Sequence, residues 1–202
     1  DVLTPIPMTD CARAIQYLRY KASEFGIDPT RVAVSGGSAG AVITMWIAYK
    51  DDMANPDSDD PVERQSTRVT CITPKAGPTN LDPDWIQANL GGSKEVHSSL
   101  PVFYGVHDGD FSSKDVKQLI ADASVINHAS AGDPPSLIIY GGELDNVPLP
   151  EDASQGLVIH HPSFGKVLKD KLDKVGVECD FRYGRNRDSQ TEFEFLKKHL
   201  SR

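Results

Sequence analysis

The sequence has little positive charge and no long apolar run. Its 202 residues contain 21 Lys and Arg against 29 Asp and Glu, a formal net charge of −8. Nucleic acids and anionic membrane surfaces are bound through basic faces, so this balance argues against both as partners. No apolar run approaches the roughly 20 residues that a membrane-spanning helix needs, so we expect no membrane span.

Cysteine is also scarce, and its distribution excludes a disulfide scaffold. Cys11, Cys71 and Cys179 are odd in number and fall on separate predicted elements, which favours buried free thiols over a disulfide framework or a metal site. The acidic segment 51–66 lacks the central Gly and closing Glu of a calcium loop and is predicted to be a surface loop. We expect no nucleotide, flavin or metal cofactor, and the compartment stays open.

The most informative stretch is Gly36-Gly37-Ser38-Ala39-Gly40, a Gly-x-Ser-x-Gly pattern. The β-branched run 31–35 before it predicts a buried strand, and the apolar run 41–49 after it predicts a buried helix. Small flanking residues allow a tight bend that exposes the Ser38 hydroxyl. We therefore predict a nucleophile elbow, with the Ala39 N–H at the helix start facing any oxyanion formed there.

Residues 26–40 resemble the nucleophile region of the α/β-hydrolase superfamily. The similarity is greatest to the lipase/esterase branch, which includes hormone-sensitive-lipase-like enzymes and acetyl-xylan or feruloyl esterases. The resemblance implies a serine carboxylesterase that cleaves a small acyl ester through an acyl-enzyme on Ser38. The elbow is the only specific motif behind it, although the order of the later elements is also similar.

The rest of the chain alternates predicted strands and helices, which implies an α/β fold with a parallel sheet flanked by helices. We expect one hydrolase-like domain over residues 1–202, the C-terminal portion of the full fold, with about four of its strands. After an extended lead-in at 1–8 and a helix capped by Thr9 or Asp10, the predicted strands are 31–35, 69–73, 136–140 and 177–183, and residues 93–112 are predicted to be irregular.

Two carboxylates could be the acid of a catalytic triad. The family order is Ser, then Asp or Glu, then His, with the acid just past a strand. Asp145 follows the predicted strand 136–140 and is the expected acid, with Glu143 as its rival. The alternative for both is a solvated loop carboxylate.

The histidine departs from the family pattern, because the loop 184–189 after the last predicted strand contains none. His160 or His161 could be the base from an unusual position, or the pair could shape a helix start or contact substrate. The remaining histidines are weaker candidates, and His199 is expected to be solvated on the last helix; the others are His97, His107 and His128.

The N-terminal region also departs from the family pattern. No His-Gly-Gly-rich loop, which supplies half of the family's oxyanion hole, precedes Asp10. The family's first strands are also absent, so the elbow strand would expose an apolar edge. We expect either a homodimer that covers this edge or a fragment of a longer hydrolase. These departures also favour a second hypothesis, a hydrolase-fold binding or interaction protein that has lost catalysis.

Overall fold

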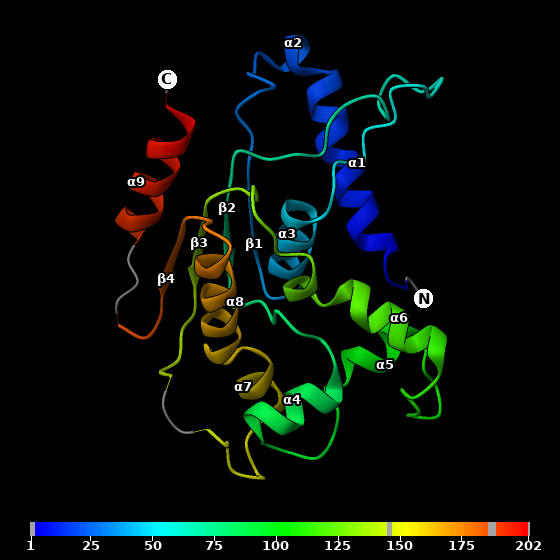
Figure 1. The fold of residues 1–202 in the computed structure, drawn as a ribbon, viewed down its shortest axis with the longest axis vertical. Coiled ribbons are helices and arrows are strands. Elements are labelled where there is room, and N and C mark those ends of the chain that lie inside the picture. The colour runs from blue at the N-terminus through cyan, green and yellow to red at the C-terminus, as the bar shows by residue number, and fades with distance from the viewer. Residues whose placement is uncertain (1–2, 145–146, 186–188, 202) are drawn as a thin grey trace.

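The core of the fold is a four-stranded parallel sheet, seen in a computed structural model that describes residues 3–144, 147–185 and 189–201 (Figure 1). The strand order is β1-β2-β3-β4, and every neighbouring pair is parallel. This confirms the predicted α/β class and the four strands. The strands are β1 (Ala33–Gly37), β2 (Cys71–Lys75), β3 (Ser136–Ile139) and β4 (Cys179–Arg182).

Helices connect successive strands, as parallel pairing requires. The larger core packs one sheet face against α3 and α8, and α1 packs on α3, while α9 covers the opposite face through a small cluster around Phe195. In Figure 1, α9 stands apart from the other helices. The helices are α1 (Ile6–Tyr20), α2 (Ala22–Phe25), α3 (Ala39–Tyr49), α4 (Pro83–Leu90), α5 (Ser99–Tyr104), α6 (Lys114–Ala123), the 3₁₀ helix η1 (Val125–Asn127), α7 (Gln155–Ile159), α8 (Ser163–Lys174) and α9 (Ser189–Leu200).

Helix α3 is apolar around its whole circumference because both of its sides are covered. It packs on β1 and β2 on one side and against α1 and η1 on the other. Met45 is fully buried and Trp46 and Tyr49 are each 3% exposed. This burial fixes the helix that begins directly after Ser38.

Three local predictions were wrong. The first helix begins at Ile6 instead of after Thr9 or Asp10. Pro7 is tolerated in its first turn because the N–H that a proline lacks would have no acceptor within the helix at that position. The short helix α5 lies in the segment predicted to be irregular, and α7 was not predicted at all. Helices of five or six residues carry too little periodicity to be recognised in sequence.

The three cysteines are free thiols, but only one is fully buried. Burial raises the pKa of the Cys71 thiol to about 11 and that of Cys179 to about 12, so both stay protonated at neutral pH. Cys11 is exposed on α1, which corrects the expectation of burial for that residue.

The β1 strand forms one edge of the described sheet, since its only strand partner there is β2. Ser35 and Gly37 on this strand are exposed. Of the helices within the described residues, none is both long enough and apolar enough to cross a membrane.

Candidate active site

Ser38 lies in the sharp turn between β1 and α3, as the Gly-x-Ser-x-Gly pattern predicted. Its backbone has φ 52° and ψ −117°, a strained conformation for a residue with a side chain. The Ser38 N–H donates to the Lys75 carbonyl at the end of β2, over 2.9 Å. The Ser38 carbonyl accepts from the N–H groups of Ala41 and Val42 at 3.0 and 3.1 Å. Both backbone groups are therefore held, and the side chain is exposed at the tip of the turn.

The first glycine of the motif permits this turn, and the last is not required by packing. A Cβ built on Gly36 would lie 2.4 Å from the Gly40 carbonyl oxygen, where no atom fits. A Cβ on Gly40 would meet nothing within 4 Å. The strand and the helix thus approach closely at Gly36.

His160 is the imidazole that reaches Ser38. The Ser38 Oγ and His160 Nε2 atoms are 2.8 Å apart, and His160 Nδ1 is 2.8 Å from the Gly156 carbonyl oxygen. A carbonyl only accepts, so Nδ1 carries the proton and donates to it. Nε2 is then left with a lone pair to accept the Ser38 proton, which is the tautomer that a general base needs.

Helix α7 determines where His160 lies. The Ser154 hydroxyl caps the helix by accepting the Leu157 N–H at 3.2 Å, and His160 is its C-cap residue. The Gln155 side chain ties α7 to the preceding loop by accepting the Ser98 N–H at 3.1 Å and donating to the Val96 carbonyl at 3.4 Å.

Close packing also holds this helix. Gly92 has φ 82°, and a Cβ there would lie 2.6 Å from a Val158 methyl carbon of α7. Positive φ and the missing side chain together make glycine the residue that fits at this position. No sequence motif marked α7, so the sequence offered His160 only as one member of the His160–His161 pair.

His161 points elsewhere although it is the next residue. Its side chain is 3% exposed, and its Nδ1 accepts the Ser163 N–H at 3.2 Å and lies 3.0 Å from the Ser163 hydroxyl. His161 therefore sits at the start of α8. This is the helix-start role that the sequence left open for one of the pair.

Of the two carboxylates predicted as the triad acid, the structure describes only one. Asp145 lies outside the described residues. Glu143 is described, and its carboxylate lies against Gly184: a Cβ on Gly184 would be 2.4 Å from the Glu143 Oε1 atom. Gly184 opens the loop after β4, so Glu143 faces the loop in which the family pattern places its histidine. The described partner of His160 Nδ1 is instead the Gly156 carbonyl.

The start of α3 offers hydrogen-bond donors to an anion. Ala39 is its first residue, and the first N–H groups of a helix have no acceptor within it. The positive end of the helix dipole adds to their effect. Ala39 and Ser38 line the same cavity of about 230 Å³, so an anion formed on a substrate bound to Ser38 would lie near this helix end.

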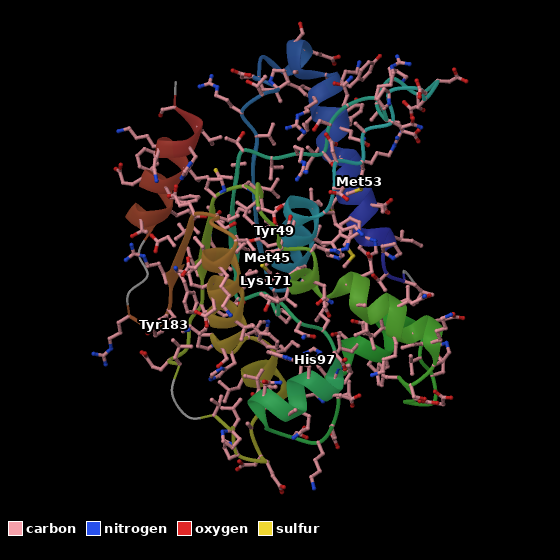
Figure 2. All side chains as sticks on the ribbon, in the orientation of Figure 1. Met45, Tyr49, Met53, His97, Lys171 and Tyr183 are labelled. Atoms are coloured by element: carbon pink, nitrogen blue, oxygen red, sulfur yellow. The ribbon has the colours of Figure 1, made fainter. Side chains whose placement is uncertain are left out.

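This cavity is mainly apolar. Val42 and Ile43 of α3, Met8 of α1 and Phe103 of α5 contribute to its wall. His97 also lines it, in the region of Figure 2 where α4, α5 and α7 gather. Burial, and the repulsion that a second positive charge close to His160 would meet, lower the pKa of His97 below its ordinary value.

The other histidines take structural or exposed positions. His107 is exposed, and His128 Nε2 lies 2.7 Å from the Asp122 carbonyl oxygen. His199 was expected to be solvated, but its side chain is 13% exposed, its ring lies tilted against that of Phe195, and its Nε2 is 3.4 Å from the Glu178 carboxylate. The described residues contain no group of three His, Cys, Asp or Glu side chains suited to a metal ion.

Solved structures with this fold are named as esterases and related hydrolases. An acetyl ester-xyloside bifunctional hydrolase from Caldicellulosiruptor lactoaceticus is 22% identical, with a TM-score of 0.61 over 98% of this chain and 64% of that one. A truncated carbohydrate esterase from gut microbiota is 20% identical, with a TM-score of 0.70 over 100% and 70%. Esterase 2 of Thermogutta terrifontis, phosphorylated by paraoxon, is 18% identical, with a TM-score of 0.60 over 96% and 65%.

These likenesses establish the α/β-hydrolase fold, and the chain spans about two thirds of the length of the structures it matches. No curated protein sequence matches it. The BD-FAE family profile matches residues 1–158, a range that includes Ser38 and ends two residues before His160. Since this match covers well over half of the sequence, the chain belongs to the BD-FAE family.

Proposed function

We propose that the protein is a serine carboxylesterase that cleaves a small acyl ester through an acyl-enzyme on Ser38. The observation that carries this proposal is the 2.8 Å contact between Ser38 Oγ and His160 Nε2, with His160 Nδ1 bonded to the Gly156 carbonyl. It supplies an exposed hydroxyl with a base in the correct tautomer. The esterase names of the structural neighbours support the same chemistry.

In the acylation step, Ser38 Oγ attacks the ester carbonyl carbon while its proton passes to His160 Nε2. The carbonyl oxygen becomes an oxyanion near the Ala39 N–H. As the intermediate collapses, the bond from carbon to the alkoxy oxygen breaks, and His160 returns the proton to that oxygen. The alcohol leaves and the acyl group remains on Ser38.

Deacylation repeats these steps with water. His160 accepts a proton from the water, whose oxygen attacks the acyl carbon. The bond to Ser38 Oγ then breaks, and His160 gives its proton back to Ser38 as the carboxylic acid departs. No redox partner is needed, and the enzyme is regenerated.

A neutral carbonyl in place of a carboxylate affects the rate. The Gly156 carbonyl orients His160, but it stabilises the imidazolium less than a full negative charge would. We therefore expect a slow esterase unless Asp145, which stays a prediction as triad acid, also acts on the ring. Asp145→Asn separates these cases: it lowers kcat only if the carboxylate takes part.

The test is hydrolysis of p-nitrophenyl acetate by the natural chain beside Ser38→Ala and His160→Ala, with fluorophosphonate labelling of Ser38. We expect hydrolysis and labelling in the natural chain, neither in Ser38→Ala, and strong loss of both in His160→Ala. Equal hydrolysis by the natural chain and Ser38→Ala would overturn the proposal.

The alternative is a hydrolase-fold binding protein without catalysis. The loop 184–189 without histidine favours it, since the family base is missing from its usual place. An unlabelled Ser38 in a folded chain would support this alternative.

We also propose that residues 1–202 form one domain that associates through its β1 edge as a homodimer. The unpaired edge in the described sheet supports this, because such an edge can pair with another strand. The mass in solution tests it: a monomer at all concentrations would contradict edge pairing.

A further inference from the structure

A sharp bend at residues 75–78 supports the candidate nucleophile from the neighbouring strand. The bend begins at Lys75, the last residue of β2, whose carbonyl accepts the Ser38 N–H over 2.9 Å. Pro78, at the other end of the bend, lines the cavity that holds Ser38. The bend therefore touches both the backbone of the nucleophile and the space in which a substrate would bind.

This bend is strained and tightly packed. Ala76 has φ 51°, in the left-handed region that a residue with a side chain rarely adopts. Gly77 is buried, and a Cβ built on it would lie 2.6 Å from the Ala41 Cβ in the first turn of α3. A backbone conformation of this kind persists only where the surrounding structure holds it. The contacts that hold the bend therefore matter for the elbow beside it.

Tyr140 provides one of these contacts. Its hydroxyl donates a hydrogen bond to the Gly77 carbonyl, and the residue is 1% exposed. Burial raises the pKa of Tyr140 far above its ordinary value, so the hydroxyl keeps its proton and remains a donor at neutral pH. One residue earlier, the Ile139 carbonyl accepts the Ala76 N–H over 2.8 Å. The end of β3 thus holds the bend at two successive residues.

The Tyr140 ring is itself fixed from α8 and β4. Gly165 of α8 leaves room for it, since a Cβ there would lie 2.5 Å from a ring carbon of Tyr140 and of Phe181. These two rings meet edge to face, with centroids 6.0 Å apart. The Tyr140 N–H also donates to the Arg182 carbonyl, over 2.8 Å. With ring and backbone both held, the hydroxyl is kept on the Gly77 carbonyl.

We propose that Tyr140 is a positioning residue for Ser38 and acts through the bend 75–78. Its hydroxyl fixes the Gly77 carbonyl, and the bend then keeps the Lys75 carbonyl on the Ser38 N–H. The inference rests on the proposed esterase function and adds to it a residue that acts without touching the reacting atoms. Attack by a serine depends steeply on its orientation. A loosened bend should therefore slow the reaction at Ser38 more than it weakens substrate binding.

The test is Tyr140→Phe, which keeps the ring and removes the hydroxyl, measured well below its melting temperature. We expect kcat for p-nitrophenyl acetate and the rate of fluorophosphonate labelling to fall about tenfold, with KM within about threefold.

Tyr49→Phe is the matched control. Tyr49 is also buried, but its hydroxyl lies 3.0 Å from the hydroxyl of Ser136, at the start of β3 and away from the bend. This variant loses a comparable buried hydrogen bond and should lower the melting temperature similarly. Its kcat should stay within about twofold, because the bend keeps its contacts.

Amide hydrogen exchange gives a readout that needs no catalysis. In Tyr140→Phe the Ser38 N–H should exchange about tenfold faster relative to the Ile72 N–H, which donates to the Pro135 carbonyl near the other end of β2. In Tyr49→Phe this ratio should not change. If Tyr140→Phe melts too low to assay, the same comparisons are made in an Ala76→Gly background. Glycine adopts this φ without strain and restores part of the lost stability.

Three results would overturn the positioning role. They are a lower melting temperature in Tyr140→Phe without a lower kcat, an equal fall of kcat in both tyrosine variants, and an unchanged ratio of exchange rates. Equal hydrolysis by the natural chain and Ser38→Ala would instead overturn the proposed function. The exchange ratio would still report whether Tyr140 holds the bend against Ser38.

Discussion

Ser38 and His160, the proposed nucleophile and its proposed base, are held in place by opposite means. Ser38 lies in a turn formed by its own neighbours in sequence, between a paired strand and a buried helix, with one further hydrogen bond to the Lys75 carbonyl. His160 ends the five-residue helix α7, which depends on Gln155 and on packing against Gly92. The position of Ser38 is thus set mainly by local backbone geometry, and that of His160 by contacts between residues distant in sequence. Perturbing each position should therefore give different results.

The largest effect is expected from removing either partner of the proposed pair. Ser38→Ala should abolish acyl-enzyme formation, and His160→Ala should lower kcat about 10²–10⁴-fold, the usual contribution of a general base. Ester hydrolysis and fluorophosphonate labelling measure both effects.

His161 provides the control for the base. His161→Asn keeps an acceptor for the Ser163 N–H and should leave kcat within about threefold, because this ring lies at the start of α8. A loss in His161→Asn as large as that in His160→Ala would reassign the base.

Next in size is the steric test of the elbow. Gly36→Ala places a Cβ against the Gly40 carbonyl and should lower the free energy of unfolding by about 2–4 kcal/mol. Gly40→Ala meets open space and should change it by about 0.5 kcal/mol or less. Chemical denaturation of both variants measures the difference, and equal losses would show that the two glycines act alike.

The tether of α7 should give a smaller effect with a different signature. Gln155→Ala removes the bonds to Ser98 and Val96, and we expect about 1 kcal/mol of stability lost with a kcat about tenfold lower. Asn89→Ala is the control: it removes a hydrogen bond from a side-chain amide to the Trp85 carbonyl within α4 and should leave kcat unchanged. A fall in stability without a fall in kcat would show that Gln155 does not position His160.

The smallest effect is expected at Glu192, which supports the elbow from α9. Burial opposes its ionisation, but hydrogen bonds from Lys75 and Thr73 outweigh this and hold the pKa of Glu192 below its ordinary value. A folded pKa below the unfolded one stabilises the protein above about pH 4.5, and this stability is lost as pH falls through the folded pKa.

Glu192→Gln should therefore lower stability at pH 7 by about 0.5 kcal/mol and flatten its fall in acid. Denaturation between pH 3 and pH 7 measures both changes. Glu24→Gln, at an exposed pair with Lys21, is the control and should leave the acid dependence of stability unaltered. An equal change in both variants would remove any special role for Glu192.

The sequence by itself determined the parts of this protein that depend on neighbouring residues. The strand, turn and helix around Ser38 follow from a β-branched run, small residues and an apolar run, and the four parallel strands follow from alternating patterns. The sequence also narrowed the candidates for a base to His160 and His161.

Only the tertiary structure shows which of those two histidines lies against Ser38, namely His160. The choice depends on α7, a helix too short to have a periodic signal, and on contacts of Gln155 with residues 57 and 59 positions away. The 122-residue separation of Ser38 and His160 is likewise closed by packing alone. Local patterns contain no information on such distances, because the free energy that fixes them comes from surfaces buried between elements.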